Sequence, residues 1–157
     1  MKKVIFCVFT IFISAFFAYS VPVEWLIADG GNGHYYETAL IPEGIDWESA
    51  QSNAMSKGGY LATIASVEEN MFVFSLVSNN PDFWIRLTDS HNPDFIYGED
   101  PWLGGFKSAN GSWHWATEEP FVYTNWAPYE PDPYTYNDQL QFFGGKSILF
   151  TILEETL

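Results

Sequence analysis

Four residues whose side-chain oxygens can bind a metal ion lie close together in the sequence, near the end of the chain: Glu130, Asp132, Asn137 and Asp138. Carboxylate and amide oxygens are the ligands that Ca²⁺ prefers in proteins. Prolines are frequent in the same segment, and because proline restricts the backbone they can hold such ligands in place at little entropic cost. The segment therefore predicts a calcium site. The alternative is a set of solvated loop carboxylates, which is the usual state of such side chains.

Two segments with strand-like alternation border this loop. Trp113 and Trp115 flank His114, a pattern typical of a half-buried strand in which His114 faces outward. Leu140-Gln141-Phe142 alternates in the same way. The connection between the two segments is too long for an ordinary hairpin, and long loops in compact domains are usually functional.

Upstream of the loop, the sequence predicts two extended segments and a first helix. Residues 23–27 and 34–40 have strand-like composition and are separated by a glycine-rich turn. Asp46 is a good N-cap for a helix in which apolar residues recur at helical spacing. Gly58 and Gly59 predict the end of this helix.

A second helix is predicted to begin at Ser66. Ser66 and Glu69 have the spacing of a capping box, and the apolar positions Val67, Met71 and Phe74 predict the face that packs on the core. Two helices followed by strands, without βαβ alternation, predict an α+β fold.

Residues 84–87 predict the central strand, and residues 88–110 predict an irregular connection rich in Asp, Asn, Pro and Gly. Asn110-Gly111-Ser112 matches a glycosylation sequon, but Asn-Gly is also a common tight-turn dipeptide. The turn is the favoured interpretation.

Taken in order, these motifs resemble the C-type lectin-like domain, in the cysteine-free form found in bacterial secreted proteins. The resemblance covers residues 33–142 and is carried by GHYYE, DWESAQSNAMSKGGYLATIAS followed by EEN, WIRL, NWAPYEPD and NDQLQF. It implies an α+β fold with two helices flanking small antiparallel sheets and a long irregular ligand loop, formed by one domain over residues 21–157. It also implies calcium-assisted binding of a carbohydrate or glycoconjugate, without enzymatic activity.

The resemblance also implies roles for individual residues. The family triplet that aligns with Glu130-Pro131-Asp132 supplies two calcium ligands that also bind sugar hydroxyls. Asn137 matches the family's next ligand, and Asp138 replaces it if the loop is shifted by one residue. The aromatic side chains expected to cover an apolar sugar face are Tyr129, Tyr134 and Tyr136. Glu130-Pro131-Asp132 combines the first residue of the family's mannose-type motif with the last residue of its galactose-type motif, so it does not predict which sugar is bound.

The segment 143–157 departs from the family. The Trp-Asn-Asp motif and the closing strand have no counterpart, so calcium binding is expected to be weak or lost. Residues 148–153 are β-prone and predict either a hairpin through Gly144-Gly145 or a replacement for the closing strand. A truncated or frame-shifted copy with impaired binding is therefore an alternative.

Residues 1–20 have the charge, apolar run and small-residue end of a signal peptide, and they contain Cys7, the only cysteine. The apolar run is shorter than the ~20 residues of a spanning helix, so a membrane anchor is the weaker alternative. With 20 acidic residues against six basic ones, nucleic acid and anionic membranes are disfavoured partners. The expected location is secreted or extracytoplasmic, in the periplasm or outside the cell, with no stable membrane insertion once the signal is removed.

Two other function classes remain. The same fold can serve as a metal-independent protein-binding or surface-display module. A hydrolase would need two carboxyl groups on opposite sides of a scissile bond, and neighbours in one loop, such as Glu118-Glu119 or the Glu130/Asp132 pair, seldom provide that geometry.

Overall fold

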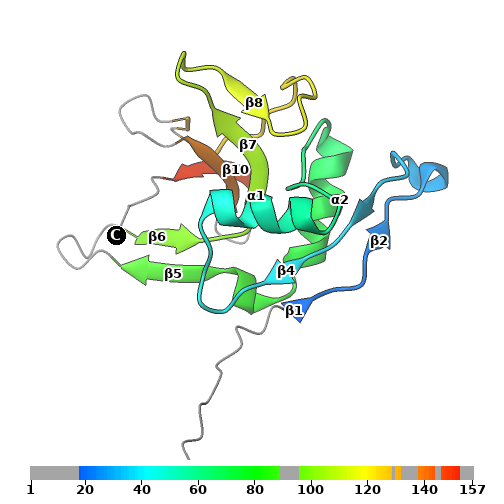
Figure 1. The fold of residues 1–157 in the computed structure, drawn as a ribbon, viewed down its shortest axis with the longest axis horizontal. Helices are drawn as coiled ribbons and strands as arrows, with labels where there is room; N and C mark the ends of the chain where they lie inside the picture. The colour runs from blue at the N-terminus through cyan, green and yellow to red at the C-terminus, as the bar shows by residue number, and fades with distance from the viewer. Residues whose placement is uncertain (1–17, 89–95, 129, 132–137, 144–145, 153–157) are drawn as a thin grey trace, which may run out of the picture.

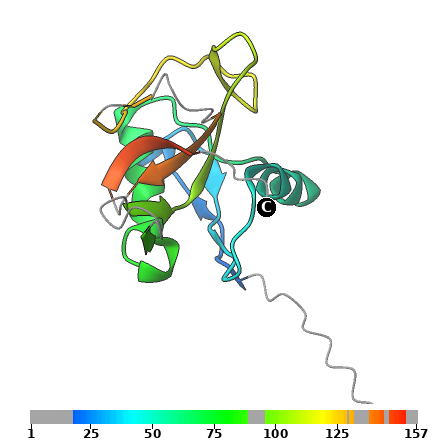
Figure 2. The ribbon, with the colours of Figure 1, turned by 90° about the vertical axis from the view of Figure 1, so that its left-hand side faces the viewer.

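The structure of the 157-residue chain is a computed structural model that describes residues 18–88, 96–128, 130–131, 138–143 and 146–152. Within these residues it contains two α-helices, two short 3₁₀ helices and ten strands arranged in four small antiparallel sheets. The axes of the two α-helices cross rather than run side by side (Figures 1 and 2). This arrangement confirms the predicted α+β class.

Helix α1 spans Trp47–Ser56 and begins where the sequence predicts. The carboxylate of Asp46 accepts hydrogen bonds from the Ser49 backbone N–H at 2.6 Å and from the Ser49 hydroxyl at 2.8 Å. This N-cap satisfies a backbone donor that has no partner within the helix. The helix ends before Gly58, which has φ +83° and donates to the carbonyl of Met55.

Helix α2 spans Val67–Val77 and is capped by Ser66, whose hydroxyl accepts from the Glu69 backbone N–H at 3.1 Å. The N-cap is therefore confirmed. The second half of the capping box is different, because the Glu69 carboxylate accepts from the backbone N–H of Ala65 and not of Ser66.

The predicted core face of α2 is largely wrong. Val67 and Met71 are 52% and 54% exposed, and only Phe74 packs against the core. The buried face contains two polar and two apolar residues: Glu69, Asn70, Val73 and Val77. Apolar periodicity missed this face because two of its residues are polar; hydrogen bonds from Asn32, Tyr36 and Ala65 allow Glu69 to be buried.

The largest sheet has the strand order β10-β9-β7-β8 and is antiparallel throughout. Its members are β7 (Trp102–Lys107), β8 (Trp113–Trp115), β9 (Gln139–Phe143) and β10 (Lys146–Ile152). In β8, His114 is exposed and Trp115 is buried, which confirms the predicted alternation. In β9, by contrast, Leu140, Gln141 and Phe142 are all buried, because this strand lies inside the sheet.

The three other sheets have two strands each. They pair β1 (Ala18–Tyr19) with β4 (Ala39–Leu40), β2 (Val23–Glu24) with β3 (Tyr35–Tyr36), and β5 (Ile85–Thr88) with β6 (Ile96–Glu99). The predicted extended segments near the N-terminus are thus confirmed as short strands. The 3₁₀ helices are η1 (Ile27–Asp29) and η2 (Pro81–Phe83).

The strand predicted at residues 84–87 is confirmed as β5, but its predicted central position is wrong, because β5 pairs only with β6 among the described strands. The inner strand β7 instead lies within the segment 88–110, which was predicted to be irregular. Composition misled the prediction because Gly104 and Gly105 are required by close packing rather than by a turn. A Cβ at Gly104 would lie 2.5 Å from the carbonyl oxygen of Leu61, and one at Gly105 would lie 2.1 Å from Leu140 Cδ1.

The core lies between α2 and the four-stranded sheet. It contains Ile64, Val73, Val77, Leu103, Trp115, Leu140 and Phe142. The turn predicted at Asn110-Gly111 is confirmed: Gly111 has φ +84°, and the Asn110 side chain accepts from the Ser112 backbone N–H.

Both ends of the chain bear on earlier predictions. β10 folds back onto β9, which confirms the hairpin interpretation of the tail.

The predicted signal peptide lies mostly outside the described residues. β1 and the hydrogen bond from the Ser20 N–H to the carbonyl of Thr38 fall within it and would be lost on cleavage after Ser20. No helix in the described residues is both long and apolar enough to cross a membrane.

Candidate carbohydrate and metal site

The loop between β8 and β9 is anchored by aromatic packing on β8. Trp115 and Phe121 have ring centroids 4.9 Å apart, and those of Trp113 and Trp126 are 5.3 Å apart. Ala127, the next residue, is only 4% exposed. The first half of the loop is therefore fixed to the sheet by burial of its aromatic side chains.

Glu130 follows this anchor directly. Its backbone N–H donates to the carbonyl of Ala127 at 3.0 Å, and its side chain is half-buried. The Glu130–Pro131 peptide bond is cis. The hydrogen bond to Ala127 holds the backbone of this predicted calcium ligand in a turn.

Asp138 lies at the other end of the loop, just before β9. Its carboxylate forms an ion pair with the ammonium of Lys107 at 3.4 Å, and its carbonyl accepts from the Lys107 backbone N–H at 2.6 Å. The Lys107 ammonium also lies 5.7 Å from the ring centroid of Trp113. A cation bound to Asp138 would therefore either displace the Lys107 ammonium or be repelled by its positive charge.

The remaining predicted site residues lie outside the described residues: Asp132, Asn137, Tyr129, Tyr134 and Tyr136. In the rest of the chain that the structure describes, no three His, Cys, Asp or Glu side chains are grouped so as to hold a metal ion. The donor chemistry of Glu130 fits Ca²⁺. Asp138 fits less well because it already has a cationic partner.

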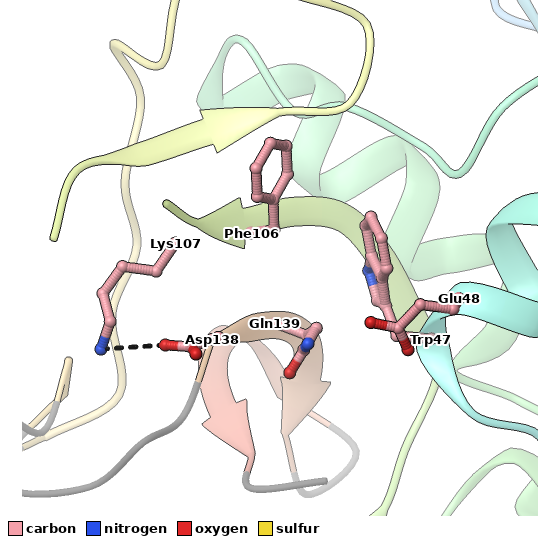
Figure 3. Close-up of a pocket in the computed structure, with 6 residues that line it drawn as sticks. All are labelled: Trp47, Glu48, Phe106, Lys107, Asp138 and Gln139. Carbon is pink, nitrogen blue, oxygen red and sulfur yellow. Dashed lines mark ion pairs between the residues drawn. The ribbon is translucent and has the colours of Figure 1, made fainter. Parts of the chain in front are cut away.

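An open groove of about 280 Å³ lies beside Asp138 (Figure 3). It is lined by Trp47, Glu48, Phe106, Lys107, Asp138 and Gln139. The sequence did not predict this groove. The lining residues come from α1, β7 and the start of β9, so no local motif marks them.

The other predicted carboxylates have separate surroundings. Glu119 accepts a hydrogen bond from the Thr63 hydroxyl at 3.1 Å, and Glu118 is exposed, with φ +64°. The structure thus places Glu119 in a packing role against the segment that precedes α2.

Comparison with known protein families decides the classification of this fold. The family model of the lectin C-type domain matches residues 43–139, more than half of the chain. This chain belongs to the C-type lectin domain family. Domains of this family are generally binding modules without enzymatic activity.

Individual relatives agree with this assignment. The chain is 26% identical over 112 residues to a type-2 ice-structuring protein of Brachyopsis segaliensis, covering 71% of this chain and 52% of that protein. It is 29% identical over 91 residues to the galactose-specific lectin nattectin of Thalassophryne nattereri, covering 56% and 47%. The C-type lectin CEL-I of Cucumaria echinata has the same fold, with a TM-score of 0.53, 20% identity and coverage of 69% and 74%.

These comparisons also limit the earlier expectations. The chain spans about half or less of the length of the known relatives that it matches. The relatives named above are animal proteins, so the comparisons give no support to the predicted bacterial type. The family itself and its α+β fold are confirmed.

Proposed function

We propose that this lectin domain is secreted and binds a carbohydrate through its long loop with the assistance of Ca²⁺. The observation that carries the proposal is the position of Glu130. This residue follows a buried anchor in the loop, and its backbone is fixed by the hydrogen bond to Ala127. Because the backbone of Glu130 is already ordered, little backbone entropy is lost when its half-buried side chain binds an ion or a sugar.

The ion would be held by Glu130 together with Asp132 and Asn137, and Asp138 is the alternative to Asn137. When bound, Ca²⁺ supplies coordination positions for two sugar hydroxyls. The carboxylates accept hydrogen bonds from the same hydroxyls. Tyr129, Tyr134 and Tyr136 are the candidates for covering an apolar face of the ring.

Carbohydrate as the ligand class is supported by the family and by the similarity to a galactose-specific lectin. The acidic charge of the chain also disfavours polyanionic ligands. Extracellular location is supported by the sequence of residues 1–20, which has the features of a signal peptide.

A metal-independent binding module for a protein partner is the second candidate, and one observation favours it. The Lys107 ammonium already neutralises Asp138, so this part of the site is stable without a metal ion. A domain with impaired calcium binding would follow from the same ion pair.

Titration calorimetry with Ca²⁺, followed by retention on immobilised mannose and galactose, tests the proposal. Binding heat and chelator-sensitive retention are expected for the wild-type chain. Glu130→Gln should lose at least tenfold in calcium affinity, because the substitution removes a charged ligand. Glu118→Gln, in the same loop, is the matched control and should behave as wild type. Absence of heat at millimolar Ca²⁺, with retention unchanged by chelator, would favour the metal-independent candidate instead.

A further inference from the structure

The groove beside Asp138 is an open hollow lined by both aromatic and polar residues. Its volume of about 280 Å³ is just below the range for ligand pockets, roughly 300–1,000 Å³, so it has room for a single small ring and no more. Figure 3 shows Trp47 and Glu48 on one side, Lys107 and Asp138 on the other, and Phe106 and Gln139 between them. The lining residues thus come from three parts of the chain, α1, β7 and the start of β9.

Two aromatic rings give the groove a rigid apolar wall. The ring centroids of Trp47 and Phe106 are 6.0 Å apart, with an angle of 52° between the ring planes, and both rings are half-buried. The indole N–H of Trp47 donates to the carbonyl of Leu103 at 2.7 Å, which fixes the orientation of the ring. Amphipathic ligands pack their C–H faces on such surfaces.

The polar lining complements a ligand with many hydroxyl groups. Glu48 offers acceptors, Gln139 offers both donors and acceptors, and Lys107 and Asp138 add a donor and further acceptors at the opposite side. Because Lys107 and Asp138 form an ion pair, they leave only the charge of the exposed Glu48 in excess. Apolar walls, mixed donors and acceptors and little net charge match a neutral saccharide.

We propose that this groove binds one neutral pyranose ring without a metal ion. The inference rests on the proposed carbohydrate-binding function, but the contacts in the groove need no Ca²⁺.

Protein NMR in the presence of a chelator tests this proposal. Methyl mannoside, methyl galactoside and methyl N-acetylglucosaminide are titrated separately into the full chain. At least one should shift the backbone signals of Phe106, Lys107 and Gln139 and the indole signal of Trp47. Phe106→Leu should weaken this binding about threefold to tenfold, the loss expected for one aromatic contact.

Glu48→Ala is a second variant, and because Glu48 is exposed its removal leaves the packing intact. It should also weaken binding, whereas Glu43→Ala, an exposed carboxylate away from the groove, should not. Shifts that vanish in chelator, or that map elsewhere, would overturn the proposal. Saturation by tetramethylammonium but by none of the glycosides would also overturn it, since the aromatic rings and Glu48 would then be a cation site.

The two proposals fail separately. If calorimetry shows no heat on addition of Ca²⁺ but a glycoside shifts the NMR signals of the groove residues in chelator, the calcium-assisted function is wrong and the groove proposal stands. If the protein is retained on immobilised sugar only with Ca²⁺ and no glycoside shifts the NMR signals of the groove residues in chelator, the calcium-assisted function stands and the groove proposal is wrong.

Discussion

Replacement of Glu69 by Gln is expected to destabilise the domain strongly although Glu69 is not among the predicted site residues. Its side chain is 4% exposed, and both carboxylate oxygens accept hydrogen bonds. One oxygen accepts from the Ala65 backbone N–H at 2.6 Å; the other accepts from the Tyr36 hydroxyl and from the Asn32 side-chain N–H at 2.9 Å. This network links α2 to the N-terminal strands.

The magnitude follows from the donors that Gln cannot satisfy. Its amide nitrogen must replace one of the two oxygens and would then face an N–H or O–H donor. A hydrogen bond to a charged group contributes roughly 1.5–3 kcal/mol, and a buried donor left without a partner costs about 1–3 kcal/mol. Because Asn32 and Tyr36 are partly exposed and can bind water, we expect a loss of about 2–4 kcal/mol in the free energy of unfolding.

Urea denaturation of Glu69→Gln against Glu68→Gln measures this effect. Glu68 lies in the same first turn of α2 but is exposed, so both variants lose a similar interaction with the helix dipole, about 0.3–1 kcal/mol. The excess loss in Glu69→Gln reports the buried network. A double-mutant cycle with Tyr36→Phe should give a coupling energy of about 0.5–3 kcal/mol. Equal losses in the two Gln variants, with no coupling to Tyr36, would refute the reasoning.

Two further predictions concern packing and pH. Gly105→Ala should cost about 1–3 kcal/mol in a denaturant melt because the new methyl group would collide with the buried Leu140, whereas Gly59→Ala, which meets only ordinary contacts, should cost far less. Hydrogen bonds from Ser49 lower the pKa of Asp46 in the folded state, so its charge stabilises the fold above about pH 4 and this contribution is lost as the pH falls through the folded-state pKa. Thermal melts should therefore show a steeper acid loss for wild type than for Asp46→Asn, and parallel curves would contradict this assignment.

Local signals in the sequence predicted the helix starts and turns well. Asp46 and Ser66 cap their helices as expected, and Asn110-Gly111 forms the turn between β7 and β8. Each of these features depends on side chains within three residues of the backbone group that they satisfy, so local sequence contains the necessary information. The ordered motifs also identified the family.

Contacts between distant segments could not be predicted in the same way. The strand β7 was missed because the glycines that resemble a loop are there to let Leu61 and Leu140 approach. The ion pair between Lys107 and Asp138 joins residues that only the sheet brings together.

By itself, therefore, the sequence determined the helix caps, the aromatic strand before the loop, the lectin family and the oxygen ligands available for a metal ion. The tertiary structure decided which face of α2 is buried, which strands lie inside the sheet and which cation neutralises Asp138. The physical reason is that capping and turn formation are satisfied within a few residues. Burial and charge pairing instead depend on segments that meet only when the chain is folded.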